Sequence, residues 1–395
     1  MTGSVSAALN PEEARPDPVA LAISLAERFR VTASQYDRTG EFATGNFQAL
    51  FESGLLGLVT AEKDGGWGEG VETAHAVITV IAKGDPSTAL ILAMHYSVHA
   101  AIRRGKWPAD VAAKVLAANR RGTALINNAQ AEPGVGSPAH GGLPETTARI
   151  EDDVWVVNGR KSFVTGLPGL KWAVVLAVTT EETPRLVQLL VPLDEPGIAQ
   201  EKAWNATGMF ATASHDLVLT EVRVPLTDIV AEQPASEPLR RDEAHGNNFF
   251  ILLASVYQGV ALSARDDLLR HLNGHVPASL GTPLSSIPRI QEGLGQIEVL
   301  LAVNRRLLLS VARDVDAGEK VGTDALAVRH VVIDNAVTVT DLALDLAGNR
   351  GLRRDYNLER HHRDAITARA HAPQNHMIRT TLGRQAIHGV GKAQQ

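Results

Sequence analysis

The sequence predicts an α+β fold in three parts: an N-terminal helical domain (residues 1–122), a middle antiparallel β-domain (123–231) and a C-terminal four-helix bundle (232–395). The first observation is that apolar residues recur at helical spacing up to about Gly122. The second is that the period then changes to two, in short runs separated by Gly, Pro and Asn. The third is that long helical patterns return after a polar linker near residues 232–242.

Helices are expected throughout the first part. Two long segments, residues 76–83 and 86–103, carry apolar side chains with helical periodicity. An earlier helix is marked by four apolar residues that fall on one face: Val19, Ala22, Ile23 and Ala26.

The middle part contains β-rich runs at residues 154–157, 173–178, 186–191 and 217–224. Asn158-Gly159 is the dipeptide that most often forms a tight hairpin turn, so we expect a turn there, followed by a strand through Thr165. These short strands predict a small antiparallel barrel or sandwich.

The last part shows four helical patterns, at residues 249–271, 287–317, 325–347 and about 375–387. Four helices of this kind are expected to form a bundle.

Composition excludes several classes of protein. A length of 395 residues with 44% hydrophobic and 21% charged residues predicts a globular protein rather than a disordered one. The formal net charge of −6 gives no basic footprint, so neither nucleic acid nor an anionic membrane is expected as a partner. The absence of cysteine fits a reducing compartment, and no run is apolar enough to span a bilayer. We therefore expect a cytoplasmic protein.

Motifs in all three parts resemble one family. The turn Glu132-Pro133-Gly134-Val135-Gly136-Ser137, the segment from Asn158 to Gly166 and the strand ending at Pro225 follow one another in the middle part. Together they resemble the middle domain of the acyl-CoA dehydrogenase superfamily. The segment 54–68, with its repeated glycines, and the segment 351–364 resemble the N-terminal and C-terminal patterns of the same superfamily.

The resemblance implies a flavin site in the β-domain. It places the Thr165 hydroxyl at flavin N5 and Phe163 where the family often has tryptophan. Glycines of the turn bring backbone amides close to a ligand, so Gly136 and Ser137 are expected to bind the cofactor. Gln130, just before the turn, is assigned to the same set.

The residues expected at the adenosine half of a flavin are only partly present. The glycine-rich turn contains Gly348 and Arg350, while Asp345 stands where glutamine is usual. The arginine that clamps the FAD pyrophosphate in many relatives has no counterpart in the segment 277–281. FMN, or reduced flavin delivered by a separate flavin reductase, is therefore expected, and Arg350 leaves FAD open as an alternative.

The base of a dehydrogenase is missing. By the resemblance, the catalytic glutamate falls on Ala372, and an alternative position in the family falls on Phe249. Neither residue accepts a proton. A displaced base such as Asp242 or Glu243 remains an alternative.

Histidines stand near the missing base. His371 precedes Ala372-Pro373, and this resembles the flavin-dependent, dibenzothiophene-oxidising monooxygenase branch of the superfamily. That branch also has a histidine facing the flavin from the N-terminal domain, and His95 is the candidate. Imidazole exchanges a proton near neutral pH, which suits oxygen chemistry. The other possibility is that His95 and His99, four apart on one helical face, are ordinary core or surface histidines. Their spacing also fits a pair of metal ligands, but no third ligand accompanies them, so no zinc site is expected.

The predicted function is the oxygenase component of a two-component flavin-dependent monooxygenase that uses O2 on a small organic substrate. The resemblance implies a homo-oligomer, either a dimer or a tetramer. An acyl-CoA dehydrogenase with a displaced base, and an inactive member that only binds flavin or acyl-CoA, are the alternatives. His361-His362 is expected at a solvated helix terminus.

Overall fold

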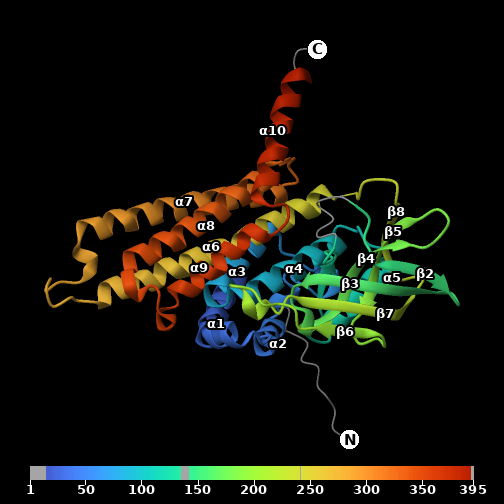
Figure 1. Cartoon of the computed structure of the whole chain (residues 1–395), viewed down its shortest axis with the longest axis horizontal. Helices are drawn as coiled ribbons and strands as arrows, with labels where there is room; N and C mark the ends of the chain where they lie inside the picture. The colour runs from blue at the N-terminus through green and yellow to red at the C-terminus, as the bar shows by residue number, and fades with distance from the viewer. Residues whose placement is uncertain (1–14, 135–141, 241, 393–395) are drawn as a thin grey trace, which may run out of the picture.

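The computed structural model describes residues 15–134, 142–240 and 242–392. Helices α1 to α5, a β-domain and helices α6 to α10 follow one another along the chain (Figure 1). The β-domain lies at one end of the molecule, and the long C-terminal helices extend away from it. The predicted three-part fold is confirmed, whereas the domain boundaries after residues 122 and 231 stay predictions.

The N-terminal helices are α1 (Pro18–Thr39), α2 (Thr44–Glu52), α3 (Val71–Gly84), α4 (Pro86–Arg103) and α5 (Ala109–Asn119). Two of them begin in the same way. Asp17 and Asp85 accept hydrogen bonds from backbone amides of the first turns of α1 and α4, and a proline follows each. An acidic cap and a proline at the first helical position both favour a helix start.

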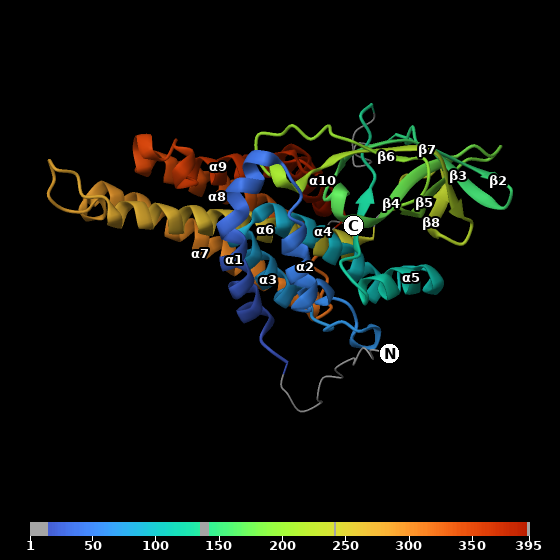
Figure 2. The same cartoon turned by 90° about the horizontal axis from the view of Figure 1, so that it is seen from below.

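The strands are β1 (Leu125–Ala129), β2 (Thr147–Glu151), β3 (Val154–Val164), β4 (Leu170–Thr179), β5 (Arg185–Pro192), β6 (Ile198–Glu201), β7 (His215–Pro225) and β8 (Ile229–Pro234). They form one sheet in the order β6-β7-β3-β2-β4-β5-β8, and β1 also pairs with β4. Most pairs are antiparallel, but β1 and β2 run parallel to β4. Figure 2 shows the sheet beside α4 and α5.

The prediction of a hairpin turn at Asn158-Gly159 is wrong. The turn between β2 and β3 is made by Asp152 and Asp153, both with positive φ, and β3 continues through Asn158. Gly159 instead lies at a shift in the register between β3 and β7. A Cβ at this position would come within 2.4 Å of the Thr146 hydroxyl, so glycine is required by close packing rather than by a turn.

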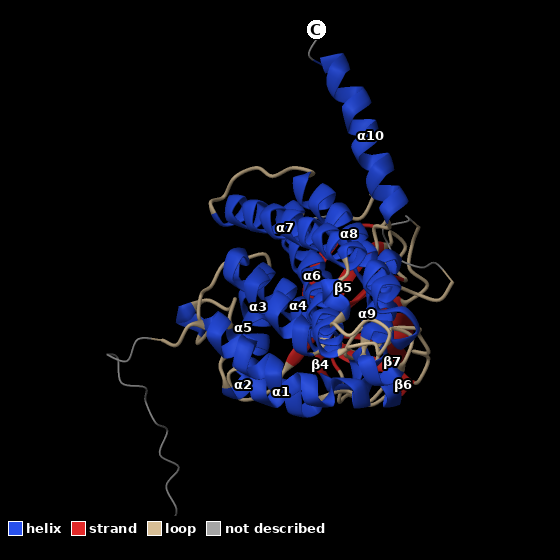
Figure 3. Cartoon of the chain, turned by 90° about the vertical axis from the view of Figure 1, so that its left-hand side faces the viewer, coloured by secondary structure: helices blue, strands red, loops and turns tan. Residues whose placement is uncertain are grey.

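The C-terminal helices are α6 (Glu243–Gly274), α7 (Pro288–Asp316), α8 (Asp324–Ala347), α9 (Leu358–Thr367) and α10 (Asn375–Lys392). The sequence predicts the helix near residue 375 as the fourth helix of the bundle, and this is wrong. The fourth helix packed in the bundle is α9, which contacts α6 and α8. The predicted helix is α10, and it projects away from the body (Figure 3). His361 is also not solvated: it is 2% exposed and its Nε2 lies 2.8 Å from Asp267 Oδ2.

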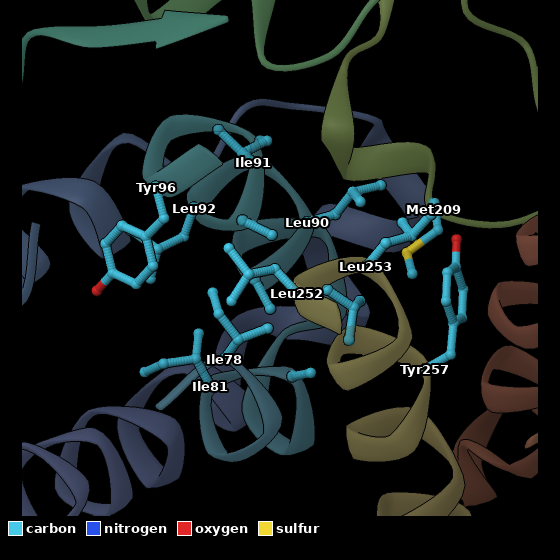
Figure 4. Close-up of a cluster of buried hydrophobic side chains, with 14 of the residues drawn as sticks. Ile78, Ile81, Leu90, Ile91, Leu92, Tyr96, Met209, Leu252, Leu253 and Tyr257 are labelled. Atoms are coloured by element: carbon cyan, nitrogen blue, oxygen red, sulfur yellow. The ribbon is translucent and has the colours of Figure 1, made fainter. Parts of the chain in front are cut away.

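A continuous apolar core joins the domains. Side chains of α3, α4 and α6 pack together, and Tyr257 of α6 lies beside Met209 from the β-domain (Figure 4). In the described ranges, no helix combines the length and apolar character that crossing a membrane requires.

Candidate functional site

The candidate site lies where the β-domain meets the helices. The end of β3, which leads into Thr165, lies beside the segment 208–214 that precedes β7. The same segment contacts α9, because the Met209 amide donates to Asp364 Oδ1 over 2.6 Å. A Cβ on Gly208 would come within 2.2 Å of the Arg363 carbonyl, so only glycine allows this approach.

Thr165 belongs to a chain of hydroxyl groups. The Ser214 hydroxyl donates to Thr165 Oγ1 at 3.1 Å, and Thr212 Oγ1 lies 2.8 Å from Ser214 Oγ. Backbone contacts hold the same residues: Asn127 Nδ2 donates to the Thr165 carbonyl, and the Gly166 amide donates to the Thr212 carbonyl. Thr165 is half-buried, and these contacts hold its backbone and its hydroxyl in place.

Phe163 presents an aromatic surface two residues earlier. Its φ of 58° lies in the left-handed region, which is unfavourable for an aromatic residue. Its side chain is 64% exposed and meets the ring of Trp204 edge to face, with the ring centroids 6.3 Å apart. A strained backbone that exposes a large apolar ring points to a binding role.

His371 is paired with a tyrosine. The Tyr257 hydroxyl lies 2.7 Å from His371 Nε2. Burial lowers the pKa of His371 to about 3, and the nearby positive charge of Arg329 acts in the same direction. Burial also raises the pKa of Tyr257. The contact is therefore a hydrogen bond between a protonated phenol and a neutral imidazole, and the tautomer of His371 sets its direction.

Arg329 holds the backbone around His371. Its guanidinium donates to the carbonyl of His371 at 2.8 Å and to the carbonyl of Pro373, and it lies over the ring of Phe250. Arg329 is 1% exposed, and burial lowers its pKa to about 10. This buried cation fixes the backbone on both sides of Ala372, the position at which the resemblance predicts the base of a dehydrogenase.

His95 is a core residue of α4. It is fully buried, its ring lies 4.2 Å from that of His99, and neither ring nitrogen has a well-formed hydrogen bond among the described residues. Burial, and next the neighbouring His99, hold the pKa of His95 well below its usual value, although the Leu56 carbonyl opposes the shift. His99 Nδ1 bonds with the Thr60 hydroxyl at 2.9 Å. No hydrogen bond or ring contact in the described structure links His95 to His371.

The turn after β1 is anchored by a buried ion pair. Glu132 is 2% exposed and accepts hydrogen bonds from Lys161, which is fully buried, and from Thr146. The Ser162 amide also donates to the carbonyl of Ala131. These contacts fix the approach to the predicted cofactor turn. Gly136 and Ser137 themselves lie outside the described residues, and Gln130 is half-buried beside the turn.

Gly348 and Arg350 lie away from this site. They follow the end of α8, about 27 Å along the helix axis from Arg329 at a rise of 1.5 Å per residue. Arg350 there lies over the ring of Tyr356, with 6.0 Å between the guanidinium carbon and the ring centroid. Within one chain, the structure does not bring these two residues to Thr165 and His371.

Carboxylates near the missing base are few. Ala372 and Phe249 occupy the two expected positions, Glu243 is exposed at the start of α6, and Asp242 forms an ion pair with Arg104. Asp364 is the buried carboxyl of the site. Burial, and next the negative Asp37, raise its pKa to about 7.

Sequence patterns gave no signal for four residues of the site: Ser214, Tyr257, Arg329 and Asp364. Tyr257 and Arg329 lie within helices whose apolar periodicity predicts ordinary core positions. Asp364 ends the segment 351–364, whose resemblance to the family's C-terminal pattern assigns it no role in the site.

The chain combines a helical domain, a β-domain and a C-terminal bundle in this order, with a polar site where they meet. This arrangement defines the class of acyl-CoA dehydrogenase-like proteins. Family models match this chain over residues 23–105 (Acyl-CoA dehydrogenase, N-terminal domain), 128–222 (middle domain) and 251–376 (C-terminal domain). A relative from Bacillus subtilis (strain 168), "Putative acyl-CoA dehydrogenase YdbM", is 31% identical over 92% of this chain and 94% of its own length. The chain therefore belongs to the acyl-CoA dehydrogenase family.

Solved structures share the fold across reaction types. Butyryl-CoA dehydrogenase from Megasphaera elsdenii is similar with a TM-score of 0.84 and 23% identity, covering 96% of this chain and 100% of that one. TdsC from Paenibacillus sp. A11-2, solved with FMN and indole, is similar with a TM-score of 0.82 and 22% identity, covering 94% of this chain and 97% of that one. The fold alone therefore does not choose between the reactions.

Proposed function

We propose that this protein is a flavin-dependent monooxygenase, the oxygenase component of a two-component system that uses reduced flavin and O2 on a small organic substrate. One observation carries the proposal. The position of the dehydrogenase base is Ala372, and the polar side chain beside it is the neutral His371, hydrogen-bonded to Tyr257. A neutral imidazole beside a tyrosine moves protons but is a poor substitute for a carboxylate that must remove the α-proton of a thioester.

The residues at the end of β3 fit a flavin ring. Because Ser214 donates to Thr165 Oγ1, Thr165 keeps its own proton and one lone pair for a ligand. The exposed ring of Phe163 offers an apolar contact next to this hydroxyl. Reduced flavin supplies the two electrons that split O2, with one oxygen atom going to the substrate and the other to water. FMN and FAD both suit these contacts.

The protein's own groups would then have separate tasks. Thr165 would orient the flavin ring through a hydrogen bond, and Phe163 would exclude water from one side of that ring. In the tautomer that carries its proton on Nδ1, His371 accepts a hydrogen bond from the Tyr257 phenol at Nε2, and it can donate the Nδ1 proton while the phenol proton passes to Nε2 in its place. In this proposal a separate reductase supplies the reduced flavin, and the protein works as a homo-oligomer. His95 would act only if the core around it opens.

The decisive experiment measures oxygen uptake and product formation with reduced flavin. We expect His371→Ala to lower productive oxygenation by about 10²- to 10⁴-fold and to increase hydrogen peroxide release, while reduced flavin still binds. Tyr257→Phe, which keeps the ring but removes the hydroxyl, should lower the rate less. Full activity in the His371→Ala protein would contradict the assigned role.

A second candidate is an acyl-CoA dehydrogenase with a displaced base. It is favoured by the similarity to YdbM and by the buried carboxyl of Asp364, whose pKa is raised to about 7. This candidate predicts that acyl-CoA esters bleach the oxidised flavin of the protein without oxygen, in rapid anaerobic mixing. Such bleaching would remove the monooxygenase proposal, and a protein inactive in both assays would be a binding member of the family.

A further inference from the structure

The candidate site includes a strained backbone segment that joins the β-domain to α9. Met209 and Ala213 have φ values of 53° and 44°, in the left-handed region that favours glycine. The short turn between them carries Thr212, whose hydroxyl bonds with that of Ser214, and Ser214 in turn donates to Thr165. This segment therefore helps to position the Thr165 hydroxyl.

The segment is held from several sides. A left-handed conformation is unfavourable for a residue other than glycine, and it persists only where the surroundings fix it. The Gly166 amide donates to the Thr212 carbonyl at 2.8 Å, and Trp204 Nε1 donates to the Met209 carbonyl at 3.1 Å. Both contacts involve carbonyl groups, so the Met209 amide needs a separate acceptor.

Asp364 of α9 supplies that acceptor. Its Oδ1 accepts a hydrogen bond from the Met209 amide at 2.6 Å, and the residue is 3% exposed. The segment 208–214 contains no ionisable side chain, so the carboxyl meets the backbone of this segment rather than a charged partner in it. A carboxyl buried to this extent acts on its protein neighbours.

The same turn of α9 reaches the other half of the site. The Thr367 hydroxyl donates to the Asp364 carbonyl at 2.6 Å, and its oxygen lies 3.5 Å from the Tyr257 hydroxyl. Tyr257 is the hydrogen-bond partner of His371, and its ring lies beside Met209 (Figure 4). Asp364 therefore lies between the hydroxyl chain of the β-domain and the pair formed by His371 and Tyr257.

The charges around Asp364 bring its ionisation close to neutral pH. Burial, and next the negative Asp37 of α1, raise its pKa to about 7, while Arg360, the backbone hydrogen bond and Arg363 oppose the shift. Tyr257 faces the carboxyl from α6 and stays neutral, because burial raises the pKa of its phenol. The Asp364 carboxyl is therefore largely neutral at about pH 6 and largely charged at about pH 8.

We propose that Asp364 is a positioning residue of the flavin site, and that it holds the segment 208–214 through the Met209 amide more firmly when its carboxyl is ionised. An ionised acceptor forms a hydrogen bond roughly twice as strong as a neutral one. Flavin binding is therefore stronger above about pH 7 than below it. This inference rests on the flavin site of the proposed function and not on the choice between monooxygenase and dehydrogenase.

The test is titration of the full chain with oxidised FMN, followed by absorbance at about pH 6 and about pH 8. The unchanged protein should bind FMN about three- to tenfold more tightly at the higher pH. Asp364→Asn keeps an oxygen that accepts from the Met209 amide but cannot ionise, so FMN should still bind and this pH dependence should disappear. Asp364→Leu removes the acceptor, and its affinity for FMN should fall by about tenfold or more at both pH values.

Two further variants separate positioning from a general effect on the fold. Asp267→Asn changes another buried carboxyl, which bonds with His361, and it should leave the pH dependence of FMN binding as in the unchanged protein. Ala213→Gly relieves the left-handed strain of the segment. Added to Asp364→Leu, it should therefore recover the FMN affinity by at least about threefold.

Equal pH dependences in the unchanged protein and in Asp364→Asn would overturn the proposal, and this comparison decides even where Asp364→Leu does not fold. Undiminished FMN affinity in a folded Asp364→Leu protein would also overturn it. The same holds for a loss of affinity that Ala213→Gly does not reduce, because Asp364 would then act on another element. Failure of the proposed function looks different: the unchanged protein would bind no FMN at either pH, which overturns the flavin site and this inference together.

Discussion

Ser214 determines what Thr165 can offer to a ligand. A hydroxyl has one proton and two lone pairs, and the donation from Ser214 occupies one lone pair of Thr165. Thr165 therefore keeps a proton to donate and a second lone pair to accept.

We expect Thr165→Val to weaken flavin binding by about two- to tenfold, the equivalent of one net hydrogen bond. Ser214→Ala should have a smaller effect, because Thr165 keeps its hydroxyl but loses the group that orients it. Titration followed by flavin absorbance measures both. Thr220→Val, an exposed position on β7, is the control, and equal affinities in all proteins would place the flavin elsewhere.

At the scale of single elements, the loop after α6 bears on the choice of flavin. Its backbone forms a compact turn, in which the Pro277 carbonyl accepts from the amides of Leu280 and Gly281, and the segment 277–281 contains no cationic side chain. We expect FMN and FAD to bind with affinities within about tenfold, a difference of about 1.4 kcal/mol or less. Pro277→Arg should shift the preference toward FAD, measured by parallel titrations. FAD affinity higher by several powers of ten in the unchanged protein would contradict the prediction.

Element types could be predicted from the sequence better than element partners. The period of the apolar residues predicts helices and strands, but the strong local preference of Asn158-Gly159 predicts a turn that the structure does not have. Pairing of Gly159 with Leu219 of β7 overrides that preference. The sequence analysis does not predict the helix α9, because it is short, contains few apolar residues and buries the polar side chains of Arg360 and His361.

At the scale of the whole molecule, the family and the three-part fold could be predicted because motifs in all three parts agree. Candidate site residues could be named only where the family resemblance assigns them, as for Thr165 and His371, and these two assignments stay predictions. The contacts that define their chemistry come from distant segments: Tyr257 is 114 residues from His371, and Ser214 is 49 residues from Thr165. Such contacts depend on packing between domains, which periodicity does not encode.

Buried neutral histidines also couple the stability of the whole fold to pH. Burial lowers the pKa values of His75 and His99 to about 4, while in the unfolded chain both return to about 6.5. Between these values the unfolded state binds more protons, so stability is complete above about pH 6.5 and is lost as the pH falls toward 4. Asp364 acts in the opposite direction, because its raised pKa favours the folded state as the pH falls below about 7.

A difference measurement isolates one histidine from these opposing effects. We expect each of the two histidines to contribute a loss of about 2 kcal/mol in the free energy of unfolding between pH 7 and pH 5. His75→Asn keeps a polar group near the Ser255 hydroxyl, which lies 2.9 Å from His75 Nδ1, but removes the titrating ring. Urea unfolding of this variant and of the unchanged protein at both pH values should show a pH dependence smaller by about 2 kcal/mol in the variant. Because Asp364 is present in both proteins, its contribution cancels, and identical pH dependences would mean that His75 keeps its ordinary pKa in the folded state.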